Sequence, residues 1–104
     1  MEQIAFRMRL NPGRKVEYKR RHDEIWPELV HLLHEAGIRD YSIFYDEQSD
    51  ALFAVLRRVA DHKMDHLPEQ DIMRKWWHYM ADLMATGPDS APEVLALQPM
   101  FHMD

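Results

Sequence analysis

The 104-residue sequence predicts an α+β domain whose elements follow the order β-α-β-β-α-β. Apolar and polar residues alternate with a period of two over residues 3–10, 38–45, 51–59 and 95–101, which is typical of strands. Residues 16–36 and 69–84 instead carry apolar side chains at helical spacing. This order is that of a ferredoxin-like sheet with both helices packed on one side, so we expect a single domain over residues 1–104.

The first helical region is expected in two segments. The strand before it ends in a turn at Asn11-Pro12-Gly13, and the helical pattern then runs to Trp26. Pro27 breaks or bends the helix, because it lacks an N–H donor and its ring clashes with the preceding turn. The pattern resumes up to Gly37, which stands where a left-handed C-cap is favoured.

Residues 38–59 are expected to form a β-hairpin around a polar turn at residues 46–50. Both arms carry apolar side chains on both faces. In the first arm, one face has Tyr41, Ile43 and Tyr45 and the opposite face has Phe44. In the second arm, one face has Leu52, Ala54 and Leu56 and the opposite face has Phe53 and Val55. Strands of this kind are covered on both faces. The chain's own helices can cover one face, and a second copy of the chain is the simplest cover for the other, so we expect a homodimer.

The C-terminal third is expected to contain the second helix and the last strand. A short helix that Pro68 interrupts or re-starts precedes the apolar stripe of residues 69–84. A loop follows at residues 87–92, and the last strand covers residues 95–101. Because Pro99 cannot donate to a ladder, this strand is expected at an edge or with a bulge.

Composition excludes several classes of function. The chain has 13 Lys and Arg against 18 Asp and Glu, for a net charge of −5, which is unfavourable for binding nucleic acid. Its one basic cluster, Lys19 to Arg21, is followed by Asp23 and Glu24 and is expected to be a solvated helix face. No apolar run approaches the ~18 residues of a membrane span, and the chain has no cysteine, so we expect a soluble cytoplasmic protein.

The same inventory disfavours metals and nucleotide cofactors. His62 and His66, and likewise His31 and His34, have helical spacing, but neither pair has the Glu of an HExxH motif or an evident third ligand. Only three glycines are present, all isolated, so no phosphate-binding loop is expected. The serines lie in no triad-like context. We expect no metal and no cofactor.

Aromatic side chains and one imidazole remain as candidates for chemistry. In a helix, Tyr18, His22 and Trp26 would stack along one face. They are either amphipathic side chains half-buried against the sheet or part of an active site. Trp76 and Trp77 point about 100° apart on a helix, so if one faces the core the other lies at its margin. Such residues suit a carbohydrate site, but both tryptophans could equally wedge between helix and sheet.

Four separated stretches resemble the L-rhamnose mutarotases: EYKRRHDEIWPEL from Glu17, YSIFYD from Tyr41, LFAV from Leu52, and KWWHYMADLM from Lys75. The likeness runs in order along the chain from the first strand to the Phe101-His102 segment. It implies a dimeric ferredoxin-like α/β barrel, an isomerase that interconverts the α and β anomers of L-rhamnose without cofactor or metal.

The resemblance also implies residue roles. His22 would be the proton donor, and Tyr18, Tyr41, Trp76 and Trp77 would contact the sugar. The chemistry requires a second acid/base group, which the sequence does not name. L-Rhamnose, L-fucose and related pyranoses stay open as substrates, with rhamnose metabolism as the suggested context. The alternatives are a dimeric α/β-barrel oxygenase or haem-handling protein, and a non-catalytic sugar-binding module.

Overall fold

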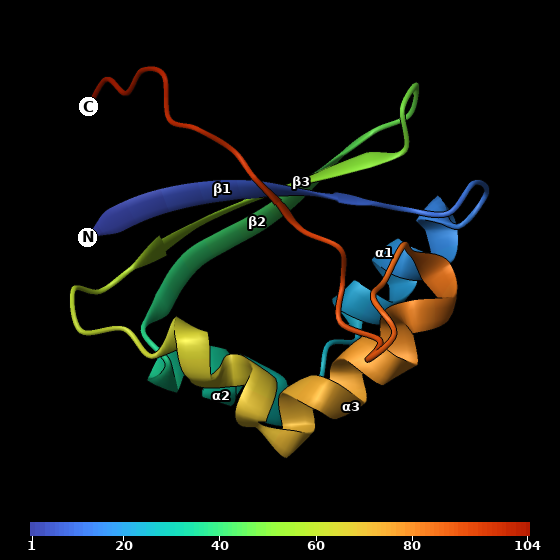
Figure 1. Ribbon diagram of the computed structural model, residues 1–104, viewed down its shortest axis with the longest axis horizontal. Coiled ribbons are helices and arrows are strands. Elements are labelled where there is room, and N and C mark those ends of the chain that lie inside the picture. The colour runs from blue at the N-terminus through green and yellow to red at the C-terminus, as the bar shows by residue number, and fades with distance from the viewer.

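The computed structural model describes residues 1–104 and contains one four-stranded antiparallel sheet with the helices on one side (Figure 1). The strand order is β2-β3-β1-β4, which is compatible with a ferredoxin-like fold. The strands and α-helices are β1 (Glu2–Arg9), α1 (Lys15–Asp23), α2 (Pro27–Glu35), β2 (Ile38–Asp46), β3 (Ala51–Arg58), α3 (Asp71–Met80) and β4 (Leu95–Ala96). Two 3₁₀ helices, η1 (Met64–Glu69) and η2 (Ala81–Leu83), flank α3.

The core lies between the helices and the inner face of the sheet. Leu52, Ala54 and Leu56 of β3 are almost completely buried, as the alternation in this strand predicted. Leu29 of α2 and Leu83 of η2 pack against this face from the helical side. The outer face of β3 carries Phe53 and Val55, which are only half-buried.

The break at Pro27 is confirmed, and it separates two helices of different direction. Helix α1 ends at Asp23, and Pro27 opens α2, where its missing N–H costs no hydrogen bond. Trp26 is the N-cap of α2 and has extended backbone angles. The expected helical row of Tyr18, His22 and Trp26 was therefore wrong in its third member, because the chain leaves the helix before that residue.

A β-bulge in β2 sets the direction of Tyr41. Ile38 pairs with Arg58 and Ser42 pairs with Val55, so β2 has one more residue than β3 between these two pairs. Asp40 takes up the extra residue with a left-handed φ of 53°. Ile38 and Tyr41 are three residues apart and would face opposite sides of a regular strand. With the bulge, both lie on the helical side.

The C-terminal elements are shorter than expected. Helix α3 ends at Met80 and continues only as the 3₁₀ turn η2, and β4 comprises Leu95 and Ala96 rather than residues 95–101. β4 is an edge strand, as expected, and pairs with Phe6 and Arg7 of β1. The chain beyond Leu97 leaves the ladder and ends on the side of the sheet away from the helices (Figure 1). None of the helices combines the length and apolar composition needed to cross a bilayer.

Candidate active site

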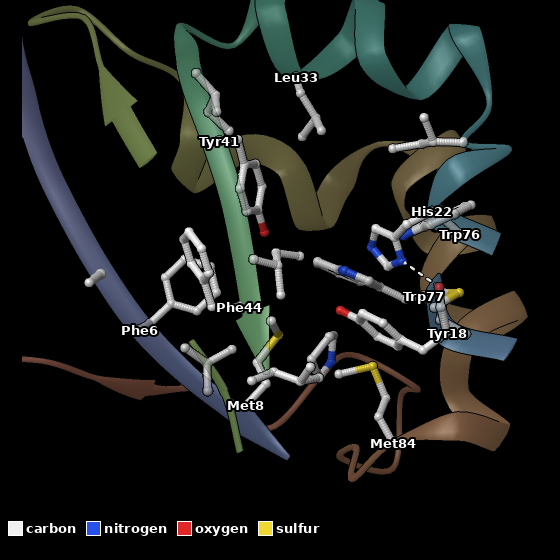
Figure 2. A pocket seen from close by; sticks show the side chains of 18 of the residues that line it. Phe6, Met8, Tyr18, His22, Leu33, Tyr41, Phe44, Trp76, Trp77 and Met84 are labelled. Atoms are coloured by element: carbon white, nitrogen blue, oxygen red, sulfur yellow. Dashed lines mark hydrogen bonds between the residues drawn. The ribbon is translucent and has the colours of Figure 1, made fainter. Parts of the chain in front are cut away.

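A large cavity of about 1590 Å³ lies between the helices and the inner face of the sheet. Hydrophobic residues make up 27 of the 38 residues that line it. Phe6 and Met8 of β1, Leu33 of α2, and Met84 form apolar parts of the wall, whereas Tyr18, His22 and Tyr41 bring polar atoms to it (Figure 2). An apolar cavity with a few converging polar groups is the usual form of a small-molecule site.

Tyr18 and His22 lie one turn apart on α1, so their rings stack with centroids 4.4 Å apart and planes inclined by 29°. Tyr18 is buried and His22 is half-buried. The spacing of these two residues in the sequence predicted this pairing, and the helix supplies it without any other element.

The hydrogen bond of His22 fixes which ring nitrogen faces the cavity. Nδ1 lies 3.1 Å from the backbone carbonyl oxygen of Tyr18, and since a carbonyl only accepts, Nδ1 must carry the proton and donate it. In the neutral imidazole, Nε2 is then the unprotonated nitrogen. Burial lowers the pKa of His22 below its ordinary value, with smaller opposing effects from this hydrogen bond and from Asp23. The neutral base is therefore the favoured form near pH 7.

Two phenols face the same space. The hydroxyl groups of Tyr18 and Tyr41 both point into the cavity, from α1 and β2 respectively (Figure 2). Burial raises the pKa of Tyr41 to about 12, and it raises that of Tyr18 further, helped by the nearby Tyr41. Although 39% of Tyr41 is exposed, its hydroxyl is the part directed inward. Both phenols are thus neutral hydrogen-bond donors at physiological pH.

The two adjacent tryptophans take different positions, one in the core and one at its margin, as their helical spacing predicted. Trp76 is buried, and its ring meets His22 edge to face at 5.3 Å. Trp77 is half-buried at the margin, and both line the cavity. Trp26 instead stacks on Tyr79 at 5.5 Å and contacts the other side of Trp76 at 5.1 Å. It therefore supports the site from behind and does not line the cavity.

The structure brings all five predicted site residues, namely Tyr18, His22, Tyr41, Trp76 and Trp77, to one cavity. It adds apolar lining that sequence reasoning missed, notably Phe6, Met8, Leu33 and Met84. The alternation of apolar residues in β1 predicted that Phe6 and Met8 point inward. It could not distinguish residues of the packed core from residues that line a cavity. No three His, Cys, Asp or Glu side chains lie close enough to form a metal site.

The fold and the cavity define a small α+β protein whose apolar cavity receives one imidazole and two phenols. A family model described as L-rhamnose mutarotase matches residues 3–103. Proteins named L-rhamnose mutarotase from Burkholderia orbicola and Paraburkholderia phytofirmans are 64% and 61% identical over 104 residues, covering 100% of this chain and 100% and 97% of theirs. A crystal structure of L-rhamnose mutarotase from Formosa agariphila, 43% identical, superposes with a TM-score of 0.93 and covers both chains completely. The chain belongs to the L-rhamnose mutarotase family.

Proposed function

We propose that the protein catalyses the interconversion of the α and β anomers of L-rhamnose, using no cofactor or metal. The observation that carries this proposal is the neutral imidazole of His22, which turns an unprotonated Nε2 toward a cavity that also receives two phenol hydroxyls. Family membership supports the same activity.

Mutarotation needs one proton moved between two oxygens on the same carbon. In ring opening, Nε2 of His22 takes the proton of the anomeric hydroxyl as the bond between C1 and the ring oxygen breaks, which gives the open aldehyde. The imidazolium returns that proton to the former ring oxygen, so no net charge remains. The aldehyde turns about the C1–C2 bond, and the reverse steps close the ring on its other face. A positioned acid/base group typically contributes about 10²–10⁴-fold.

The phenols supply what His22 alone lacks. A hydroxyl of Tyr18 or Tyr41 that donates to the ring oxygen stabilises the negative charge that develops there as the C1–O bond breaks. The raised pKa of each phenol keeps its proton in place at neutral pH. The faces of Trp76 and Trp77 suit the C–H face of a pyranose, and the apolar wall suits the C6 methyl group of a 6-deoxy sugar.

We further propose that the protein is a homodimer formed through the outer faces of two sheets, which together give an α/β barrel. That face carries Phe44 and Leu95, which are 64% and 54% exposed, beside the half-buried Phe53 and Val55. An apolar face of this kind marks a contact surface. A second copy presents the same face, as a two-fold symmetric contact requires. The cysteine-free composition suits the reducing cytoplasm, where we place the protein.

The activity is tested by saturation-difference NMR on the α and β anomers of L-rhamnose, with L-fucose in parallel. The wild type is expected to accelerate exchange, and His22→Ala to lose that acceleration by at least about 100-fold. His31→Ala is the matched control, because His31 is an exposed histidine on α2. Sugar binding without acceleration by the folded wild type would instead indicate a non-catalytic binding module.

A further inference from the structure

Arg21 departs from the expectation of a solvated basic face. Its neighbours Lys19 and Arg20 are exposed and pair with carboxylates of their own helix, as expected. The Arg21 side chain is only 12% exposed and turns toward the C-terminal end of α3. A cationic side chain that is withdrawn from solvent to this extent needs partners, and Arg21 has them on three sides.

The guanidinium group joins two helices. Nη1 and Nη2 donate to the two carboxylate oxygens of Asp82, at 2.8 and 3.3 Å, and Nη1 also donates to the backbone oxygen of Tyr79 at 2.6 Å. Nε donates to Glu17 of the same helix at 2.7 Å. These contacts lower the pKa of Asp82, chiefly through the hydrogen bond from Arg21. A planar fork of this kind fixes direction as well as distance.

The same group lies over an aromatic side chain that leads to the site. Its central carbon is 4.6 Å from the centroid of the Tyr79 ring. Tyr79 stacks on Trp26 at 5.5 Å and leans on Trp76 at 5.8 Å, and Trp76 meets His22 at 5.3 Å. Contacts of packed rings therefore connect Arg21 to the imidazole without Arg21 reaching the cavity.

We propose that Arg21 is a positioning residue, which holds the Tyr79, Trp26 and Trp76 rings so that Trp76 orients His22 and keeps water from it. Without the guanidinium group, the hydrogen bonds from α1 to Tyr79 and Asp82 are lost. The edge of Trp76 is then free to move away from the imidazole of His22. A loss of geometry on the scale of an ångström reduces turnover strongly even when substrate binding is kept.

The test compares Arg21→Met and Arg21→Lys with the control Arg74→Met. Arg74 also pairs with an aspartate, Asp71, but on the exposed side of α3 and away from the cavity. Anomer exchange in L-rhamnose gives kcat and KM, and NMR of the His22 imidazole gives its titration. We expect Arg21→Met to lower kcat about tenfold with KM within about twofold. Arg21→Lys keeps the charge without the fork and should lower kcat less, whereas Arg74→Met should match the wild type.

The His22 titration separates positioning from a purely structural role. Helix α3 contributes no titratable group to the cavity that His22 lines. The titratable or charged groups that line it are Lys15, Tyr18, Lys19 and Asp23 of α1, His34 of α2, Arg39, Asp40, Tyr41, Tyr45 and Asp46 of β2, and Glu47 and Arg58. None of them changes in these variants. Arg21→Lys keeps the positive charge, so a rise of the pKa of His22 toward its ordinary value in this variant reports the admission of water, since burial is the main cause of its lowering. In Arg21→Met the loss of the cation raises the same pKa as well.

An unshifted titration in a folded Arg21 variant would overturn the proposal, as would unchanged turnover. If Arg21→Met does not fold, Arg21→Lys decides by the same two measurements. The inference rests on the proposed function only for its kinetic part. Wild-type protein that leaves anomer exchange unaccelerated refutes that function, whereas the imidazole titration still tests the coupling between Arg21 and His22.

Discussion

We expect Phe44→Asp to disrupt the proposed homodimer and to leave a folded monomer. Phe44 of β2 pairs with Phe53 of β3 and also borders the cavity (Figure 2), and 64% of it is exposed in the single chain. A fully buried phenylalanine removes roughly 200 Å² from solvent, so roughly 130 Å² of the Phe44 surface is exposed and available for burial in a dimer. At about 25 cal/mol per Å² this is ~3 kcal/mol per protomer and ~6 kcal/mol for a symmetric pair.

That figure is an upper bound on the effect, because association also costs rigid-body and side-chain freedom. A loss of about half of it corresponds to roughly a 100-fold rise in the dimer dissociation constant. The aspartate adds to the effect, since each interface would then bury two carboxylates without a partner. We therefore expect the dimer dissociation constant to rise by at least roughly 100-fold.

Sedimentation equilibrium over a concentration series measures this constant, and near-UV circular dichroism checks that the fold is kept. Val16→Asp is the control, because Val16 is an apolar residue that is 77% exposed on α1, away from the sheet. Phe44→Asp that sediments as a dimer with the wild-type constant, or wild type that is monomeric throughout, would refute the proposed interface.

Two further predictions concern proton transfer and the bulge. Because burial lowers the pKa of His22, kcat/KM should stay at its neutral-pH value through the ordinary histidine range and fall only at lower pH. The unfolded chain binds the same proton more tightly than the folded protein does. The free energy of unfolding should therefore decrease as the pH falls from the ordinary pKa of histidine to the lowered pKa of His22. Activity that already halves above pH ~6.5 would contradict this. At the left-handed Asp40, Asp40→Gly should leave the melting temperature unchanged or raised, whereas Asp40→Val should destabilise by roughly 1–2 kcal/mol, measured by thermal unfolding.

Features that depend on spacing within one element could be predicted from the sequence. The stacking of Tyr18 on His22 follows from one helical turn, and the division between Trp76 and Trp77 follows from the 100° step of a helix. The inward set of β3 follows from strict alternation. In each case the geometry of a regular element decides where the side chain points, and no distant contact competes with it.

Features that depend on a distant partner could not be predicted. Arg21 stands between Arg20 and His22 in a charged run, and only the position of Asp82, sixty-one residues further on, withdraws it from solvent. The bulge at Asp40 is not marked by a glycine in the sequence. Trp26 leaves the expected row because α1 ends at Asp23, and its ring then stacks on Tyr79. The last strand ends at Ala96, where its pairing with Phe6 and Arg7 of β1 ends, although the N–H of Leu97 still donates to the backbone oxygen of Ala5.

Burial imposes one electrostatic condition on the three polar groups of the proposed site. Desolvation disfavours any charged form, so it lowers the pKa of the His22 imidazole and raises those of the Tyr18 and Tyr41 phenols. The three shifts have opposite signs but one result, which is that all three groups are neutral near pH 7. A neutral sugar can enter without displacing a bound ion. In the proposed mechanism, the proton that His22 takes from the anomeric oxygen leaves an imidazolium beside the negative charge that develops on the sugar. Its return to the ring oxygen removes both charges, so each half-reaction ends in the same neutral state from which the next one begins.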